Sequence, residues 1–572
     1  MSRLLWFGGL VHRLRTPLMN AAPWLQNYDP LGNSFLSTLA AASPVVVLLL
    51  CIGVFHLRVH GSALLSLAVA WVIAIAVFHM PVGMSAMTTL YGGAYGLFPI
   101  GWIILNVLFL HQLTVQRGLF DTLKQGLARV APDPRIQVIL IAFAFGAFIE
   151  GVAGFGAPVA ITGAILMQLG FKPLHASGLA LIANTAPVAF GSLGIPLTTL
   201  SQITGMDVLK LSAMVGRQLP LFSLVIPFWV VMAFVGFRKA WEVWPAALTA
   251  GLAFAIPQCL VSHWHGPYLV DLISGGSSIL ATSLLLRVWS PPRFQCDAAA
   301  GSVSNSGAGL EVPSRSGSRG FGFACLPWVV LTGSILLWSV PAVKQQLDGI
   351  ASWKIAVPGL HGLVQRVPPI ASLSAKPEAA EYKLNLLTAT GTPILVAGIL
   401  SGLLMGCSCR ELVRTWFQTL WKVRYSLITI AAMLALGNVT KFSGADGALG
   451  LVLAKTGYFY PFFGTLLGWL GVALTGSDTA SNVLFGSLQQ ITAEQTGLSP
   501  ILMGAANSSG GVMGKMVDAQ SIVVASTATG YYGQEGAILK FVFWHSLILA
   551  SLVGVWVFIL ARVPFFAGWV IR

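Results

Sequence analysis

The sequence predicts an all-α integral membrane protein with about 12–14 transmembrane helices in two repeated, inverted halves that contain re-entrant or broken helices. Three observations support this fold class. Hydrophobic residues make up 56% of the 572 residues and charged residues only 9%, whereas soluble domains carry roughly 25% charged residues. Long apolar runs recur along most of the chain. Two motifs of small and polar residues occur once in each half.

The apolar runs are long enough to form helices that cross a bilayer. Many approach or exceed about 18 residues, which span a hydrocarbon layer of about 30 Å, and they lack the alternation of barrel strands. We expect apolar helices near residues 42–57, 62–80, 94–113, 136–149, 157–170, 176–195, 219–236, 244–261, 268–289, 323–341, 386–406, 425–437, 460–475, 498–513 and 538–561. Some of the shorter runs are expected to be re-entrant.

Basic residues cluster in four segments between apolar runs, which are residues 114–135, 237–241, 287–320 and 407–424. The positive-inside bias predicts that these segments are cytoplasmic. Residues 342–385 and the region before residue 42 would then lie outside, although three arginines among the first 15 residues fit that side poorly. The formal charge of +14 therefore reflects orientation in the membrane, and we expect no nucleic-acid partner.

The expected organisation is an N-terminal extension at residues 1–23, a first transmembrane half at 24–290, a flexible cytoplasmic linker at 291–322 and a second transmembrane half at 323–572 with an extracytoplasmic loop at 342–385. The linker is predicted from its Ser-, Gly- and Ala-rich composition. Residues 1–20 have too short an apolar stretch for a cleavable signal peptide. The six cysteines are scattered, so we expect no metal site, no disulfide framework and no cofactor.

Two motifs recur in the same order in both halves. The run EGVAGFGAPVA, which starts at Glu150, matches TGSDTASNVLF, with an offset of 325 residues between Gly151 and Gly476. The run that contains Asn184 matches the run that contains Asn507 at an offset of 323 residues. Repeats with interrupted helices are typical of secondary transporters, whose substrate site lies where the broken helices meet.

Irregular backbone at bilayer depth must be buried in protein or face a wet cavity, because its N–H and C=O groups find no partner in lipid. The free N–H groups at a half-helix N-terminus attract an anion. Close helix packing through small residues, and capping of the freed backbone by Asn or Thr, remain alternative roles. The candidate substrate-binding residues are Gly154, Phe155, Gly156, Asn184, Thr185, Ser477, Thr479, Asn507, Ser508 and Lys515.

Four ionisable residues fall within the repeated motifs, namely Glu150, Asp478, Lys515 and Asp518. A charge at bilayer depth costs about 2.5–3.5 kcal/mol on insertion scales and by default marks function. Glu150 and Asp478 are the candidate proton carriers, because a carboxyl group in a low-dielectric cavity keeps its proton more readily. Lys515 would balance a substrate carboxylate, unless it only forms a structural ion pair with Asp518 or Glu150.

Other ionisable residues lie nearer the span ends. Asp271 and Arg287 are near the two ends of one span, and we expect both side chains to snorkel towards water. The histidines near span ends are expected to be interfacial rather than part of a proton relay.

Three long motifs are specific enough to compare with known families. They are GAFIEGVAGFGAPVAITGAILMQLGFKPLHASGLALIANTAPVAFGSLGIP, GWLGVALTGSDTASNVLF and AANSSGGVMGKMVDAQSI. Together with WLQNYDPLGNSFLSTLAAASP near the start, they resemble the lactate permease family over roughly residues 24–572. The resemblance implies a multi-pass protein of the bacterial plasma (inner) membrane, not an enzyme, that imports a small 2-hydroxy-monocarboxylate with a proton. The implied substrates are L-lactate, D-lactate and glycolate.

Three alternatives follow from the residues. A sodium-coupled carrier of a dicarboxylate or inorganic anion would want more than one basic group at depth, and only Lys515 is found there. An intramembrane enzyme would need a zinc, Ser/His or paired-Asp constellation, and no convincing one is present. A structural membrane protein would have little use for buried charges in repeated broken helices. The sequence leaves the oligomeric state open.

Overall fold

The computed structural model describes residues 23–53, 55, 57–119, 122, 133–152, 154, 156–291, 321–371, 376–531 and 534–572. The predicted N-terminal extension and linker lie almost entirely outside these residues. Up to residue 291 the elements are β1 (Trp24–Leu25), α2 (Ser34–Gly53), α3 (Val59–Ala76), α4 (Val82–Tyr95), η1 (Gly96–Gly101), α5 (Trp102–Gln116), α7 (Pro134–Gln137), η2 (Val138–Phe145), α8 (Gly146–Val152), α9 (Ala157–Gln168), α10 (Pro173–Ala183), η3 (Val188–Phe190), α11 (Gly191–Thr204), α12 (Val208–Gln218), α13 (Pro220–Val235), α14 (Phe237–Trp241), α15 (Trp244–Trp264) and α16 (Val270–Val288).

From residue 321 the elements are α17 (Phe321–Ser339), α18 (Pro341–Ala351), β2 (Ser352–Ala356), β3 (Val364–Gln365), β4 (Glu381–Asn385), α19 (Gly391–Leu404), α20 (Cys409–Ser443), α21 (Ala445–Ala454), η4 (Gly457–Phe459), α22 (Tyr460–Thr475), α23 (Asp478–Gln495), α24 (Pro500–Gly514), α25 (Ala519–Ala528), α26 (Glu535–Arg562) and η5 (Pro564–Trp569). Every predicted apolar run overlaps a helix. The predicted helical membrane fold with broken helices is therefore confirmed, while the division into two repeated halves stays a prediction.

Fewer single helices cross the full thickness of a bilayer than the predicted number. Within the described residues, five helices are long and apolar enough to do so, and three helix pairs bent by more than 40° raise the number to eight. The described residues also contain five shorter apolar helices of 10–17 residues. When these are added to the eight, the total falls within the predicted range of about 12–14. The difference arises because several apolar runs form half-length helices that end at a break.

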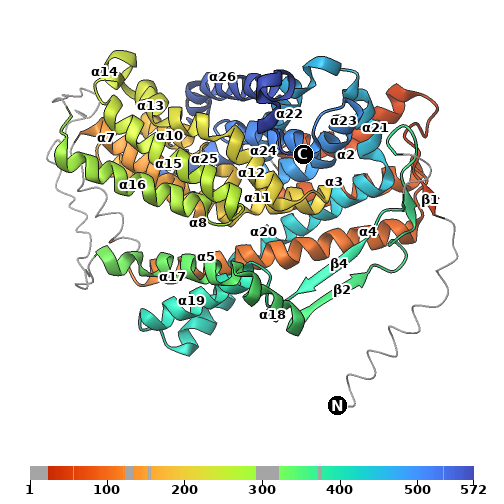
Figure 1. Ribbon diagram of the computed structural model, residues 1–572, viewed down its shortest axis with the longest axis horizontal. Helices are drawn as coiled ribbons and strands as arrows, with labels where there is room; N and C mark the ends of the chain where they lie inside the picture. Colours follow the sequence, from red (N-terminus) through yellow and green to blue (C-terminus); the bar gives the residue numbers. More distant parts are fainter. Residues whose placement is uncertain are drawn as a thin grey trace.

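The helices pack into two groups, and each draws on both sides of the predicted linker (Figure 1). We call α3, α4, η1, α5, α17, α19 and α20 the scaffold group, because α20 packs along α3, α4 and α5, and α19 packs on both α5 and α17. The hairpin group comprises the elements from η2 to α16 and from α22 to α26. Figure 1 shows α4, α5, α17 and α19 along the lower side of the molecule and most of the hairpin group above them.

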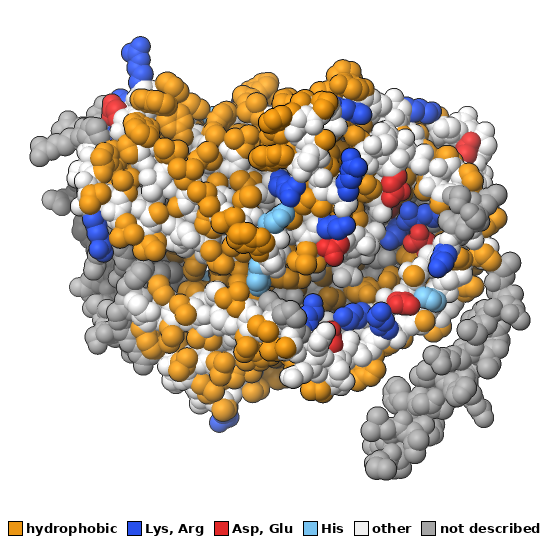
Figure 2. All heavy atoms as spheres, in the orientation of Figure 1, with side chains coloured by type: hydrophobic (Ala, Val, Ile, Leu, Met, Phe, Trp, Pro, Cys, Tyr) orange, Lys and Arg blue, Asp and Glu red, His pale blue; other side chains and the backbone are white. Residues whose placement is uncertain are grey.

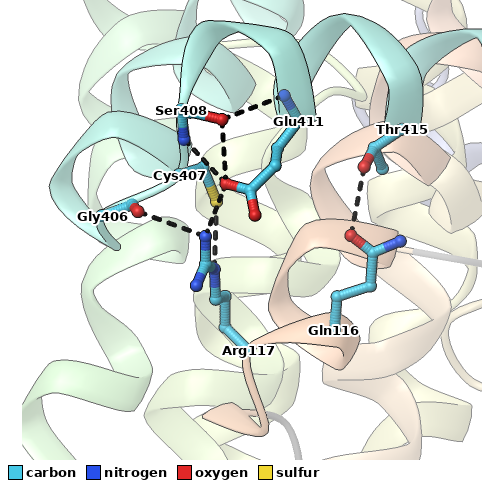
Figure 3. Close-up of polar contacts among 7 residues, drawn as sticks. All are labelled: Gln116, Arg117, Gly406, Cys407, Ser408, Glu411 and Thr415. Atoms are coloured by element: carbon cyan, nitrogen blue, oxygen red, sulfur yellow. Dashed lines mark hydrogen bonds and ion pairs between the residues drawn. The ribbon is translucent and has the colours of Figure 1, made fainter.

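Three of the four basic segments meet at one end of the molecule. Arg117, just after α5, donates to Glu411 in the first turn of α20 at 3.0 Å and to the Gly406 carbonyl at 3.2 Å (Figure 3). Arg135 donates to the carbonyl of Lys239 at 3.1 Å. These contacts agree with the prediction that the three segments share one side of the membrane.

The other end carries the only strands of the described residues. β1 pairs in parallel with β3, with Trp24 opposite Val364, and β2 pairs with β4 in an antiparallel sheet. Figure 1 places these strands on the right, away from α7 and α14 on the left. The start of the described chain and the loop 342–385 therefore share one end, as the orientation argument requires.

The exterior is largely apolar. Figure 2 shows hydrophobic side chains over much of the visible face, chiefly on the left, while most of its Lys, Arg, Asp and Glu side chains lie from the centre to the right. Large apolar residues such as Val72, Leu280 and Trp544 are more than 60% exposed. Contiguous apolar surface of this extent is rare on soluble monomers and suits contact with lipid. The protein is a multi-pass membrane protein.

Candidate functional site

A cavity of about 80 Å³ lies inside the hairpin group, where the N-terminal ends of four helices converge. Gly156 stands at the start of α9, Pro196 near the regular start of α11, Ser477 at the start of α23 and Gln520 in the first turn of α25. About 10–15 Å³ of such space holds one water molecule, so the cavity admits a molecule of about six non-hydrogen atoms.

The break between α8 and α9 depends on two glycines with left-handed backbone. The φ angles of Gly154 and Gly156 are +46° and +84°, a region that residues with a Cβ rarely adopt. A Cβ on Gly154 would also collide with the Ser192 hydroxyl. Pro158 follows in the first turn of α9, where a missing N–H costs nothing. The sequence motif thus folds into the break that was predicted.

The break between α22 and α23 is built in the same way. Gly476 ends α22 with a φ of +74°. Ser477 is extended, and its side chain accepts a hydrogen bond from the Ala480 N–H at 3.3 Å, which caps α23. Asp478 is consequently the first residue of α23, at the positive end of the helix dipole.

Two further helices are interrupted beside these hairpins. α10 and the segment Val188–Thr204 are bent by 63°. Ser192, Leu193 and Gly194 have φ angles of 47°, 57° and 74°, so the regular part of α11 begins only after them. Between α24 and α25 the chain leaves the helix, and Asp518 caps α25 by accepting from the Ser521 N–H at 2.6 Å. Four helix starts therefore face one cavity.

Lys515 supplies the positive charge of the cavity. It is 6% exposed, and its Nζ donates to the Gly476 carbonyl at 2.5 Å and lies 3.4 Å from Asp518 Oδ2. The ammonium group has three donors, so one remains for a ligand. Of the two structural ion pairs considered from the sequence, the pair with Asp518 is formed. The same lysine nonetheless lines the cavity.

Two buried carboxyl groups line the cavity from opposite hairpins. Glu150 lies in the last turn of α8 and is 4% exposed, and Asp478 is 3% exposed. Each has one buried oxygen without a hydrogen-bond partner. The other oxygen of Asp478 accepts from the Ser508 hydroxyl and from Asn482 at 3.4 Å. A proton or a ligand would satisfy the unpaired oxygens, which otherwise cost stability.

A chain of amide hydrogen bonds fixes the second hairpin. Asn507 of α24 donates to Asn482 at 2.9 Å and accepts from Gln489 at 3.1 Å. Asn482 also donates to the Pro196 carbonyl at 3.2 Å, which ties α23 to α11. Asp478, Asn482 and Gln489 share one face of α23 because they are separated by four and seven residues.

The structure brings about half of the predicted site residues together around the cavity. Those that line it are Glu150, Gly156, Ser477, Asp478, Thr479 and Lys515. Those that lie behind the lining are Gly154, Asn184, Thr185, Asn507 and Ser508. Phe155 lies outside the described residues. Thr185 bonds its own helix at the Ile182 carbonyl, whereas the buried Asn184 amide has no hydrogen-bond partner.

Two expectations need correction. The repeat aligns Asn507 with Asn184, which ends α10, but Asn507 lies inside α24, and the break comes eight residues later at Lys515. The Asn507 side chain forms hydrogen bonds with Asn482 and Gln489 of the neighbouring helix α23, and α24 remains regular at this position. Asp271 was expected to snorkel, but it is 1% exposed because Gly151 packs against it.

Sequence reasoning missed four polar contributors to the site. Ser192, Gln520 and Ser521 line the cavity, and Asn482 holds Asp478 in place. Asn482 and Ser521 lie within the motifs that were aligned between the two halves. Asn482 follows Asp478 by four residues and Ser521 follows Asp518 by three, so this spacing could have identified them. Ser192 is brought in by the strained backbone of α11, for which the sequence has no comparable signal.

An apolar crevice adjoins the cavity. It has a volume of about 130 Å³ and shares Ser477, Thr479 and Gln520 with the cavity lining. Its remaining wall is mostly apolar and includes Leu48 of α2 and Met433 of α20. The crevice therefore runs from the cavity towards the scaffold group.

Comparison with known proteins gives consistent matches along the chain. The family model described as L-lactate permease matches residues 37–564. The glycolate permease GlcA of Escherichia coli strain K12 is 42% identical over 543 residues, which cover 93% of this chain and 97% of that protein. The L-lactate permeases of Bacillus subtilis strain 168 and Escherichia coli strain K12 are each 41% identical, again over 93% of this chain and 97% of each protein.

Among solved structures, the YdaH transporter of Alcanivorax borkumensis is similar over 82% of this chain and 87% of that chain. The sequence identity is 17% and the TM-score 0.41, which is too low to support an argument about the fold.

Proposed function

We propose that this chain, which belongs to the L-lactate permease family, imports L-lactate, and also D-lactate and glycolate, by proton symport across the bacterial inner membrane. The relatives named L-lactate permease and glycolate permease are similar over nearly their whole length. The role proposed here is that of a carrier and not of an enzyme.

The observation that carries the proposal is the convergence of four helix N-termini and Lys515 on one small cavity. Each N-terminus offers unpaired N–H groups and a partial positive charge. The site is thus suited to a single carboxylate, which would accept from backbone N–H groups near Ser477 and from Lys515. A dianion would bring a second charge for which the cavity lining has no second cation.

The rest of the substrate fits the surroundings of the cavity. A 2-hydroxyl group would find hydroxyl partners in Ser192, Ser477 and Thr479. The methyl group of lactate would point towards the apolar crevice that shares Ser477 and Thr479 with the cavity. Glycolate lacks the methyl group and would leave the crevice empty.

The proton would bind at a carboxyl group of the cavity. Glu150 and Asp478 face it from the two hairpins, and each has an unpaired buried oxygen. One proton carried with one monocarboxylate makes the step electroneutral, so a pH gradient drives uptake. Alternating access would come from movement of the hairpin group against the scaffold group, because the site lies inside the first and the crevice opens towards the second.

Uptake of radiolabelled L-lactate by the purified protein in liposomes tests the proposal. We expect uptake when the exterior is acid, collapse of uptake when a protonophore removes the pH gradient, and no requirement for sodium. Competition by unlabelled glycolate but not by a dicarboxylate is also expected. Uptake that needs a sodium gradient and ignores the pH gradient would show the proposal to be wrong.

A further inference from the structure

One buried acid of the hairpin group has no role in the site described above. Asp271 lies in the first turn of α16 and is 1% exposed. Among the residues that the structure describes, it is the one acid whose two carboxyl oxygens are both buried and without a hydrogen-bond partner. An ionised carboxylate in such surroundings is very costly. Asp271 therefore needs a proton, a partner or both.

The acid that acts electrostatically on Asp271 is the cavity residue Glu150. α16 packs along α8 and η2, and the contact at Asp271 is close enough that a Cβ on Gly151 would lie 2.7 Å from the Asp271 Cβ. Glu150 precedes Gly151 in the chain, and its charge acts on Asp271. Glu150 in turn lines the cavity. Asp271 packs against Gly151, next to Glu150 in the chain, but does not itself line the cavity.

Among the described elements that pack on α16, no cation faces Asp271, whereas Lys515 acts on Glu150 from the cavity side. The elements packed on α16 are α8, η2, α11 and α15. Their titratable side chains, together with those of the loop before α16, are Glu150, Cys259, His263, His265 and Tyr268. His263 is exposed at the end of α15, and the Tyr268 hydroxyl reaches Thr198 and Thr390. Glu150 is the charged side chain that acts on Asp271.

We propose that Asp271 and Glu150 together hold the transported proton, with Asp271 as a proton-binding residue outside the substrate cavity. Two carboxyl groups that interact in a low-dielectric site do not both ionise, and they share one proton whose titration belongs to the pair. The inference rests on the proposed proton symport. Transfer within the pair breaks the O–H bond of one carboxyl as that of the other forms, so it needs no further reactant.

This arrangement separates the proton from the substrate charge. Lys515 and the helix starts would hold the carboxylate on the cavity side, while the proton could withdraw to Asp271, which does not line the cavity. Glu150 would then be the group through which the proton enters and leaves the pair. The expected signature is a variant that still binds and exchanges lactate but no longer couples it to the pH gradient.

The test compares wild type, Asp271→Asn and Ser274→Ala in proteoliposomes. Ser274 is a matched control, because it lies one turn further along α16 and its hydroxyl is also buried without a partner. Two quantities are measured for each protein. The first is lactate counterflow without a pH gradient, and the second is lactate accumulation under an imposed gradient of one pH unit, with proton entry followed by a dye in the lumen.

One-to-one coupling permits up to about tenfold accumulation at one pH unit. We expect wild type and Ser274→Ala to approach this value. Asp271→Asn should keep counterflow, but its lactate accumulation ratio should fall towards about one. The pH at which uptake by this variant is half-maximal should move to lower pH by about one unit, because Glu150 has lost a neighbouring charge. Asp271→Glu should restore coupling in part.

Wild-type accumulation and an unshifted pH profile in Asp271→Asn would overturn the inference while leaving the proposed symport intact. Absence of lactate-driven proton entry in the wild type would instead overturn the proposed function. If Asp271→Asn does not reach the membrane as a folded protein, Asp271→Ser is judged by the same criteria.

Discussion

At the scale of single residues, Lys515 combines two tasks. It ties the second hairpin to α25 through the Gly476 carbonyl and Asp518, and it presents the cation of the cavity. A buried ammonium group that served only as an ion-pair partner would not need to face open space. The position of Lys515 at the cavity wall therefore favours a role in binding an anion.

Replacement of Lys515 should separate these two tasks. We expect Lys515→Met to weaken lactate binding about 10–100-fold, because a charge-assisted hydrogen bond contributes about 1.5–3 kcal/mol. Lys515→Arg should retain part of the activity. Binding is measured by the concentration dependence of counterflow, with Lys455→Met on the exposed surface as the control.

Removal of both charges, in Lys515→Met combined with Asp518→Asn, provides a second control. If the double variant regained wild-type affinity, Lys515 would be a structural partner of Asp518 and nothing more.

At the scale of elements, the two broken hairpins pack reciprocally. The return arm α9 of the first hairpin packs on α25 of the second half, and the return arm α23 of the second hairpin packs on α11 of the first half. Each arm is thus held by a broken helix from the other half. This exchange is what a pair of repeated units would produce, and the repeat itself stays a prediction.

The breaks themselves can be tested at Gly476. Gly476→Ala should cost about 1–2 kcal/mol of stability from its left-handed backbone, and its Cβ would lie 2.9 Å from Asp518 Oδ1 at the cavity. Gly497→Ala is the matched control, because Gly497 has a φ of +67° but open space around it. Both variants should lose a similar amount of thermal stability, and only Gly476→Ala should lose most lactate uptake.

Equal loss of uptake in the two variants would mean that the break at Gly476 matters for stability alone. Thermal unfolding in detergent, followed by tryptophan fluorescence, gives the first quantity and liposome uptake the second.

The elements that the sequence predicts well are those with a purely apolar signal. α13, α15 and α26 follow directly from long apolar runs. α12 and α23 were not among the predicted runs, because Lys210 and Arg217 in the first and Asp478, Asn482 and Gln489 in the second interrupt the apolar pattern. Asp478, Asn482 and Gln489 are buried against partners from other segments, whereas Lys210 and Arg217 are not buried and donate to the carbonyls of Arg572 and Trp569 near the end of the chain. Such long-range pairing is not visible in a local window.

The site shows the same limit. Gly476-Ser477-Asp478 was recognisable because a glycine for the turn, a serine for the cap and an acid at the helix start have local causes. The three left-handed residues that begin at Ser192 depend on tertiary packing instead, since Gly194 fits tightly against Pro267. The residue types Ser and Leu do not favour left-handed backbone, so the sequence does not indicate this conformation.

At the scale of the whole molecule, the basic segments and the strands mark opposite ends. Arg117 contacts the start of α20 at one end, and β1 pairs with β3 at the other. The positive-inside bias assigns the first end to the cytoplasm. The two ends of the folded protein therefore differ, with the basic segments at the predicted cytoplasmic end and the strands at the other.

This orientation predicts which thiols a membrane-impermeant maleimide can reach. Cys409 is free and exposed at the start of α20, and we expect it to be labelled in inside-out vesicles but not in intact spheroplasts. A cysteine introduced by Lys354→Cys in β2 should show the opposite behaviour. Cys409→Ser identifies the native site by mass spectrometry, and labelling of Cys409 from outside would reverse the assigned orientation.

The contacts of Gln26 have a consequence for biosynthesis. Its side-chain amide donates to the carbonyl of Phe442, 416 residues further along the chain. A ribosome that adds about 5–20 residues per second needs roughly 20–80 s to cover that distance. The segment around Gln26 therefore cannot form these contacts until the chain has been synthesised as far as Phe442. A segment that is made early thus reaches its final position late.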